Sequence, residues 1–242
     1  MKIQDRMKDF LTYILIASSF FVSCQKIFFN EDERTRELFP GDFHAVKIKG
    51  IYNIILTQDS TNRLVITGRN DINSIDAVII DDTLIIDDHK RMSLNPGMNT
   101  LALHFSNLEY MVTYDPVNVS NTDTIKADRF SYDAIGEIAE VSLVVDCKSI
   151  IVFNSANTLG YLYFYGKAND CTFCNRYGCC IFAGSLSCRS AEIINGSVGD
   201  VYINASENIK AYIWGPGNIY YHGAPSVEIA EKRGDGKMIR IN

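Results

Sequence analysis

The chain has 242 residues, of which 47% are hydrophobic and only five are proline. A chain of this length and composition can bury one large core, and it is too rich in apolar residues to be disordered throughout. The formal net charge is −6, and no basic stripe with interleaved aromatic residues is present. Nucleic acid is therefore excluded as an expected partner.

The first 23 residues resemble an export signal. Three basic residues precede a 13-residue apolar run, Phe10–Val22, which is too short for an ordinary membrane-spanning helix. The run leads to Ser23 and Cys24, an ending that resembles the lipobox of bacterial lipoproteins, although Phe21 stands where Leu is usual. We expect cleavage after Ser23 and lipidation of Cys24, which would hold the protein at the outer membrane of a bacterial envelope, facing the periplasm or the surface. The alternative is an ordinary signal peptide or anchor with an incidental cysteine.

Residues 24–40 are polar and charged and are predicted to form a tether, so the folded domain is expected at residues 41–242. Phe43–Gly50 alternates apolar and polar residues, as a half-buried strand does. Further short strands follow, and turn residues such as Asp81-Asp82-Thr83 and Asn95-Pro96-Gly97 separate them. No stretch has a sustained helical period, so almost no helix is expected.

From Val141 to Ile229 the sequence repeats itself about every twenty residues. Each unit opens with a short alternating strand and closes with a second strand and a turn rich in Gly, Asn or Ser. The opening strands begin at Val141, Tyr161, Cys180, Val201 and Ile219, with spacings of 20, 19, 21 and 18 residues. A period of this length is typical of one coil of a β-solenoid. We predict an all-β fold, a single-stranded right-handed parallel β-helix of about ten short coils.

Three stretches resemble a known protein family: Phe43–Gln58, Ile80–Ile86 and Gly215–Pro225, the last followed by Gly234-Asp235-Gly236. On these residues the chain resembles the putative autotransporter adhesin, head GIN domain family, over roughly residues 40–242. The resemblance implies a parallel β-helix and a bacterial lipoprotein of unknown function, and it brings no catalytic residues. The sequence departs from the family in its cysteines and in several internal turns that lack Gly.

Six cysteines would remain in the mature chain, and all lie within the repeats: Cys147, Cys171, Cys174, Cys179, Cys180 and Cys188. Small apolar residues of this kind suit the inside of a rung. A disulfide, or a metal site built on the Cys171-x-x-Cys174 spacing, is the alternative in an exported protein. Cys179 and Cys180 would point to opposite faces of a strand, which disfavours a shared metal ion. We expect neither a metal nor a cofactor.

An overlay of the opening strands divides their side chains into two faces. The face that contains Val141, Tyr161, Tyr163 and Tyr165 is the more uniformly large and apolar, so it is predicted to point inward. The opposite face then presents an outer row of Leu162, Phe164, Ile181, Tyr202 and Tyr220. Together with Tyr212 and Trp214, which can stack on a sugar, this row is the candidate binding surface. The alternatives for its cover are the protein's own chain, a second copy, or a glycan or protein ligand.

The second strand of each unit carries a polar residue at a matching position: Thr172, Glu192, Lys210 and Glu228, which lie 20, 18 and 18 residues apart. Apolar residues flank each of them. The four are predicted to form an exposed ladder that marks the register of the coils.

No set of residues typical of a catalytic site can be recognised in the repeats. The acids Asp146, Asp170, Asp200 and Glu207 fall at different positions within their units, so no acidic cluster stacks on neighbouring rungs. The predicted function is therefore non-enzymatic: an envelope lipoprotein that presents a β-helical binding or packing surface, adhesin-like in character. The expected partners are a glycan or protein ligand or a second copy, and the membrane through the N-terminal lipid. The alternative function is a carbohydrate-active enzyme, a polysaccharide lyase or hydrolase, on the same scaffold.

Overall fold

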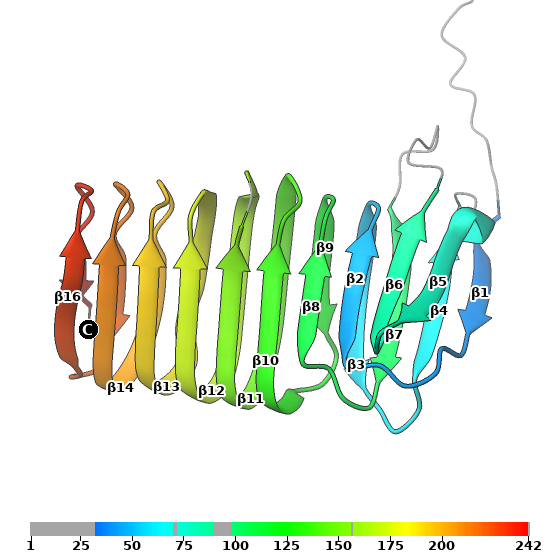
Figure 1. Ribbon diagram of the computed structural model, residues 1–242, viewed down its shortest axis with the longest axis horizontal. Helices are drawn as coiled ribbons and strands as arrows, with labels where there is room; N and C mark the ends of the chain where they lie inside the picture. The colour runs from blue at the N-terminus through cyan, green and yellow to red at the C-terminus, as the bar shows by residue number, and fades with distance from the viewer. Residues whose placement is uncertain (1–31, 70–71, 90–97, 156, 242) are drawn as a thin grey trace, which may run out of the picture. The chain divides into compact units, whose positions relative to one another are not determined.

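The computed structural model describes residues 32–69, 72–89, 98–155 and 157–241, so the predicted signal and Cys24 lie outside the described residues. Glu33–Asn242 forms one compact unit in which the chain coils around a hydrophobic core (Figure 1). The described residues contain no α-helix, only the 3-10 turn η1 (Ile72–Ser74). Accordingly, none of them belongs to a helix long and apolar enough to span a membrane.

The predicted parallel β-solenoid is confirmed, with about six turns instead of ten. The predicted number of coils was too high because the residues before Tyr110 do not form one coil for every twenty residues. Part of that region instead forms antiparallel strands that are not coils of the solenoid.

The regular part of the solenoid consists of two parallel ladders, and the long strands bend from the first ladder into the second. Ladder 1 comprises β9 (Val117–Asn121), the first halves of β11 (Ile138–Asn154), β12 (Leu159–Asn175), β13 (Gly178–Asn195) and β14 (Val201–Ile213), then β15 (Ile219–His222) and β17 (Met238–Arg240). Ladder 2 comprises β8 (Tyr110–Thr113), β10 (Ile125–Ala134), the second halves of β11 to β14, and β16 (Ser226–Lys232).

The N-terminal coils are stacked in an order that differs from their order in the chain. The coil of β2 (Ala45–Lys49) and β3 (Tyr52–Gln58) lies between β8 and β9 on one side and β6 (Thr83–Asp88) and β7 (Asn99–Phe105) on the other. The chain therefore makes the second coil of the stack first, then the outermost coil, and then returns to the third.

Antiparallel strands close this end of the stack. β4 (Arg63–Gly68) pairs with β7, β1 (Arg34–Leu38) pairs with β4, and β5 (Ile75–Ile80) pairs with β6, all antiparallel (Figure 1). β1 falls within the segment that was predicted to be a tether. The folded unit thus begins at Glu33, before the predicted boundary at residue 41.

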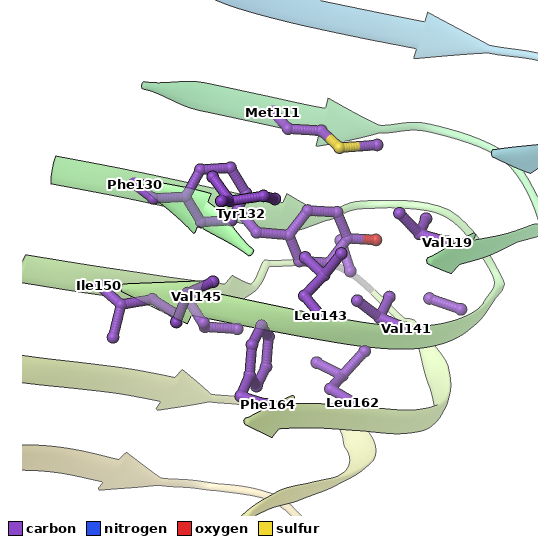
Figure 2. Packing of buried hydrophobic residues seen from close by; sticks show 14 of the residues in the cluster. Met111, Val119, Phe130, Tyr132, Val141, Leu143, Val145, Ile150, Leu162 and Phe164 are labelled. Atoms are coloured by element: carbon purple, nitrogen blue, oxygen red, sulfur yellow. The ribbon is translucent and has the colours of Figure 1, made fainter. Parts of the chain in front are cut away.

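Alternate side chains of each strand point into the space between the two ladders. Figure 2 shows Val141 and Leu143 of β11 and Leu162 and Phe164 of β12 in this space, close to Tyr132 of β10. All five are fully buried, and the Phe164 ring lies 5.9 Å from that of Phe173. The core is therefore one continuous column of apolar side chains, as stacked coils require.

Three buried asparagines satisfy the turns that follow ladder 2. Asn154, Asn175 and Asn195 pair in register on successive coils, and all are fully buried. The Asn175 amide donates to the Cys179 carbonyl at 2.7 Å, and the Asn195 amide donates to the carbonyls of Gly199 and Gly217 at 3.1 and 3.0 Å. Buried carbonyls need such partners because water does not reach them.

The six cysteines among the described residues are free thiols, and all but Cys180 are buried. Burial raises the pKa of Cys147 to about 11 and that of Cys179 to about 12, so both thiols stay protonated and unreactive at neutral pH. The Cys171 and Cys188 thiols hydrogen-bond to each other, which raises the pKa of Cys171 and lowers that of Cys188. These positions agree with the interpretation of the cysteines as small core residues.

Candidate functional site

The predicted outer row does not lie on one face. Leu162, Phe164 and Ile181 are fully buried in the core, whereas Tyr202 and Tyr220 point outward and are half-buried. The three buried residues are thus removed from the candidate binding surface.

The cause of the error is a shift of one residue in two coils. Val141 pairs with Leu162, Leu162 with Ile181, and Ile181 with Val201, whereas the overlay had aligned Val141 with Tyr161 and Cys180. A shift of one residue transfers every side chain of a strand to its other face. The tyrosines that were predicted to point inward, Tyr161, Tyr163 and Tyr165, therefore lie on the outside.

The outward face of ladder 1 carries four stacked aromatic rings on successive coils. We call Tyr163, Phe182, Tyr202 and Tyr220 the aromatic ladder. They pair in register, their ring centroids are 4.8, 5.1 and 4.8 Å apart, and their planes lie within 12°, 15° and 12° of each other. These separations match the spacing of hydrogen-bonded strands, so the solenoid itself imposes the stacking. The sequence identified Tyr202 and Tyr220 as outward residues but missed Tyr163 and Phe182.

Stacking determines which parts of the rings remain accessible. The rings of Phe182 and Tyr202 each have an aromatic neighbour in register on both sides, so mainly their edges face outward. Burial is the largest cause that raises the pKa of Tyr202, and the nearby Asp200 carboxylate is the next. The Tyr202 hydroxyl therefore remains a hydrogen-bond donor at neutral pH.

The aromatic ladder ends at Tyr163. In the next two coils the same position holds Ser142 and Ser120, both exposed. Among the described register pairs, one face of the Tyr163 ring therefore has no aromatic neighbour. Tyr161, 52% exposed, lies beside the ladder with its ring tilted by 37° from Tyr163 and 40° from Phe182. We call Tyr161, Tyr163, Ser142 and Ser120 the step.

Tyr212 and Trp214, the other two predicted site residues, lie at the end of β14 on ladder 2. Their rings meet edge to face, with centroids 6.2 Å apart. Lys210 lies 5.4 Å from the Tyr212 ring centre, and Arg233 lies 5.4 Å from that of Trp214. These rings therefore contact the protein's own cations and are separate from the aromatic ladder.

The polar residues of ladder 2 lie as predicted. Thr172 pairs with Glu192, Glu192 with Lys210, and Lys210 with Glu228, and we call these four the polar ladder. The flanking residues are buried in the inner coils. In the last strand of ladder 2, β16, the flanking residues Val227 and Ile229 are exposed.

The acids considered for catalysis do not converge in the structure. Asp146 forms an ion pair with Lys167 at 3.1 Å and Glu207 forms one with Arg189 at 3.0 Å, both at the surface. Within the described residues, no group of three or more His, Cys, Asp or Glu side chains is arranged to hold a metal ion. Asp81 and Asp82 form the turn between β5 and β6, with φ angles of 48° and 56°.

The two-ladder stack is the fold of a β-solenoid protein. A family model described as "putative auto-transporter adhesin, head GIN domain" matches residues 42–225, so the chain belongs to this family. The resemblance seen in the sequence is thereby confirmed.

Solved structures share this fold at low sequence identity. A "putative adhesin" from Bacteroides fragilis is 22% identical with a TM-score of 0.77, and the match covers 88% of this chain and 98% of that one. A "putative adhesin" from Parabacteroides merdae and a "putative lipid binding protein" from Parabacteroides distasonis are 18% and 19% identical, with TM-scores of 0.59 and 0.62 and the same coverage. The chain has no match among curated proteins. At these identities the likeness establishes the fold alone.

Proposed function

We propose that the chain is a non-enzymatic lipoprotein of the bacterial cell envelope that binds its target, in the manner of an adhesin, through the aromatic ladder. The ladder itself carries the proposal: four stacked rings are held on the outside of a rigid solenoid. A contiguous apolar stripe of this kind is typical of an interaction surface. Membership of a family described as adhesins supports binding as the function.

The envelope anchor rests on the sequence before the folded unit. The apolar run Phe10–Val22 followed by Ser23 and Cys24 supports lipidation at Cys24. Cys24→Ala should move the full chain from the membrane fraction to the soluble fraction. A variant that stays in the membrane with an unprocessed N-terminus would overturn the lipoprotein proposal.

Adhesion of bacteria that produce the full chain tests the role of the aromatic ladder. Phe182→Asp places a charge in the middle of the ladder, and it should abolish attachment to mucin-coated or fibronectin-coated surfaces at unchanged protein levels. The matched control is Ile194→Asp, which lies on the same strand but on the outward face of ladder 2. This control should adhere as the wild type does. Equal adhesion of wild type and Phe182→Asp to every surface, or no adhesion by the wild type, would overturn the proposal.

Catalysis is tested separately, because the alternative is a carbohydrate-active enzyme. The purified full chain should release no new reducing ends and no unsaturated products from a panel of neutral and acidic polysaccharides. Cleavage of any of them would overturn the non-enzymatic part of the proposal.

A further inference from the structure

We infer that the step binds a sugar ring of an uncharged glycan. This inference rests on the proposed function and deepens it, because it names the class of ligand and the position at which the ligand stacks. It assigns the contact to one end of the aromatic ladder instead of its whole length.

The rings of the aromatic ladder differ in whether one of their faces is free. A sugar stacks on an aromatic ring by placing its C–H groups against the face of the ring. The faces of Phe182 and Tyr202 are occupied by neighbouring rings, and Tyr220 is followed in register by Ile239. Tyr163 is different, because its next neighbour in register is the small Ser142. Tyr161 adds a second, tilted ring at the same end of the ladder.

Two small hydroxyl side chains form the floor of the step. Ser142 and Ser120 are exposed and lie on successive coils in register with Tyr163. Small side chains here leave the ring face uncovered, and each hydroxyl can both donate and accept a hydrogen bond. Sugar hydroxyls require partners of this kind next to the stacked face. The coils repeat about every 4.8 Å, so the two serines can serve adjacent positions along a glycan.

The charges around the step favour a neutral ligand. The register positions that flank the two serines hold Glu140 and Asn118 on one side and Val144 on the other. Among these described positions none is basic. Lys167, two residues beyond Tyr165 on β12, is paired with Asp146 at 3.1 Å. An anionic glycan or a phosphate group would therefore meet a carboxylate without a compensating cation, whereas a neutral sugar would not.

Affinity electrophoresis of the full chain tests the inference. The gels contain hydroxyethylcellulose or dextran as uncharged glycans, or polygalacturonate as an acidic one. An uncharged glycan should retard the wild type, and polygalacturonate should not. Tyr163→Ala removes the stacking face and Ser142→Leu covers it, and each should weaken retardation about tenfold or more. Tyr177→Ala removes an exposed tyrosine that lies outside both the aromatic ladder and the step, and this variant should bind as the wild type does.

Three outcomes would overturn the inference: no retardation by either uncharged glycan, equal retardation of the wild type and Ser142→Leu, or retardation by polygalacturonate as strong as that by the uncharged glycans. Ser142 is exposed, so Ser142→Leu keeps the test valid even where Tyr163→Ala lowers the melting temperature. If Phe182→Asp abolishes bacterial adhesion while no glycan binds, the proposed function stands and the sugar assignment falls. If Phe182→Asp leaves adhesion unchanged, the proposed function falls as well.

Discussion

The outward faces of the two ladders belong to the same coils but carry opposite chemistry. Ladder 1 presents the aromatic ladder, and ladder 2 presents the polar ladder with Lys210 between Glu192 and Glu228. In both, in-register strands place equivalent residues about 4.8 Å apart. At that spacing stacked rings attract each other, and charged side chains repel each other unless their signs alternate along the ladder. The backbone of the coil is therefore a common frame, and each column of side chains sets its own surface.

Truncation of a ring on the inward face of ladder 1 should have the largest effect on stability, and truncation of a ring on its outward face a much smaller one. Phe164 is fully buried, whereas Phe182, on the next coil, is half-exposed in the aromatic ladder. Phe164→Ala should lower the free energy of unfolding by about 3–5 kcal/mol, because it leaves a cavity in the core. Phe182→Ala should lower it by only about 1 kcal/mol, through the loss of ring stacking. Urea unfolding followed by circular dichroism measures both, and equal losses would contradict the observed assignment of faces.

The buried asparagines should give the second-largest effect. Asn175→Ala removes the donor to the Cys179 carbonyl and the acceptor for the Asn154 amide, which lies 3.2 Å away. The loss of stability should be about 1–3 kcal/mol, because buried polar groups are left without partners. The control is Asn208→Ala, an exposed asparagine bonded to Ser190 at 2.9 Å, which should change stability by less than about 0.5 kcal/mol. A larger loss at Asn208 than at Asn175 would show that these turns do not depend on the buried amides.

The contrast between the ladders also explains what the sequence could predict. The register of ladder 2 was predictable because each polar residue is bracketed by apolar ones, so only one alignment keeps all four outside. Ladder 1 has large apolar residues on both faces, as at Leu162 and Tyr163, and its alternation does not distinguish inside from outside. The misassigned face follows from this ambiguity.

A column of small residues would have resolved the ambiguity. Gly160, Gly199, Gly217 and Gly236 each lie two residues before an inward-facing residue, and a Cβ at any of them would collide with a carbonyl of the preceding coil. Gly160 also has a φ of 135°, which disfavours other residues. Alignment on this column gives the observed register. Ala139 and Cys179 occupy the remaining positions, and they obscure the pattern in the sequence.

The order of the N-terminal coils could not be derived from the sequence. The strands β2, β3, β6 and β7 all alternate in the way a coil requires, and parallel strands pair through the backbone with little preference for one neighbour. Which coil lies outermost depends on how β4 and β5 return antiparallel to β7 and β6. The stacking order is therefore set by tertiary contacts and not by the pattern within any one strand. The strands themselves were predictable, but their stacking was not.

The buried thiols should produce a moderate dependence of stability on pH. Burial raises the pKa of Cys147 from 9.0 to about 11, so the folded state retains this proton when the unfolded chain has lost it. The contribution is fully present below pH 9 and is lost as the pH rises towards 11. The free energy of unfolding of Cys147→Ala should therefore fall less between pH 9 and pH 11 than that of the wild type, when each is expressed relative to its own value at pH 7. Parallel curves for wild type and Cys147→Ala would contradict an alkaline titration at this site.

The smallest effect on stability is expected at the polar ladder, on the outward face of ladder 2. Lys210 is solvated, and a hydrogen bond with Tyr212 and then the charges of Glu228 and Glu192 raise its pKa. Solvated ion pairs contribute little because water and salt screen them, so Lys210→Met should lower Tm by only about 1–2 °C at low ionic strength. Added salt should remove most of the difference, because the two facing carboxylates then repel each other less. A loss that persists in high salt would show that the ammonium group of Lys210 acts mainly through its short-range contact with the Tyr212 ring, because Met keeps the apolar stem and removes only the charge.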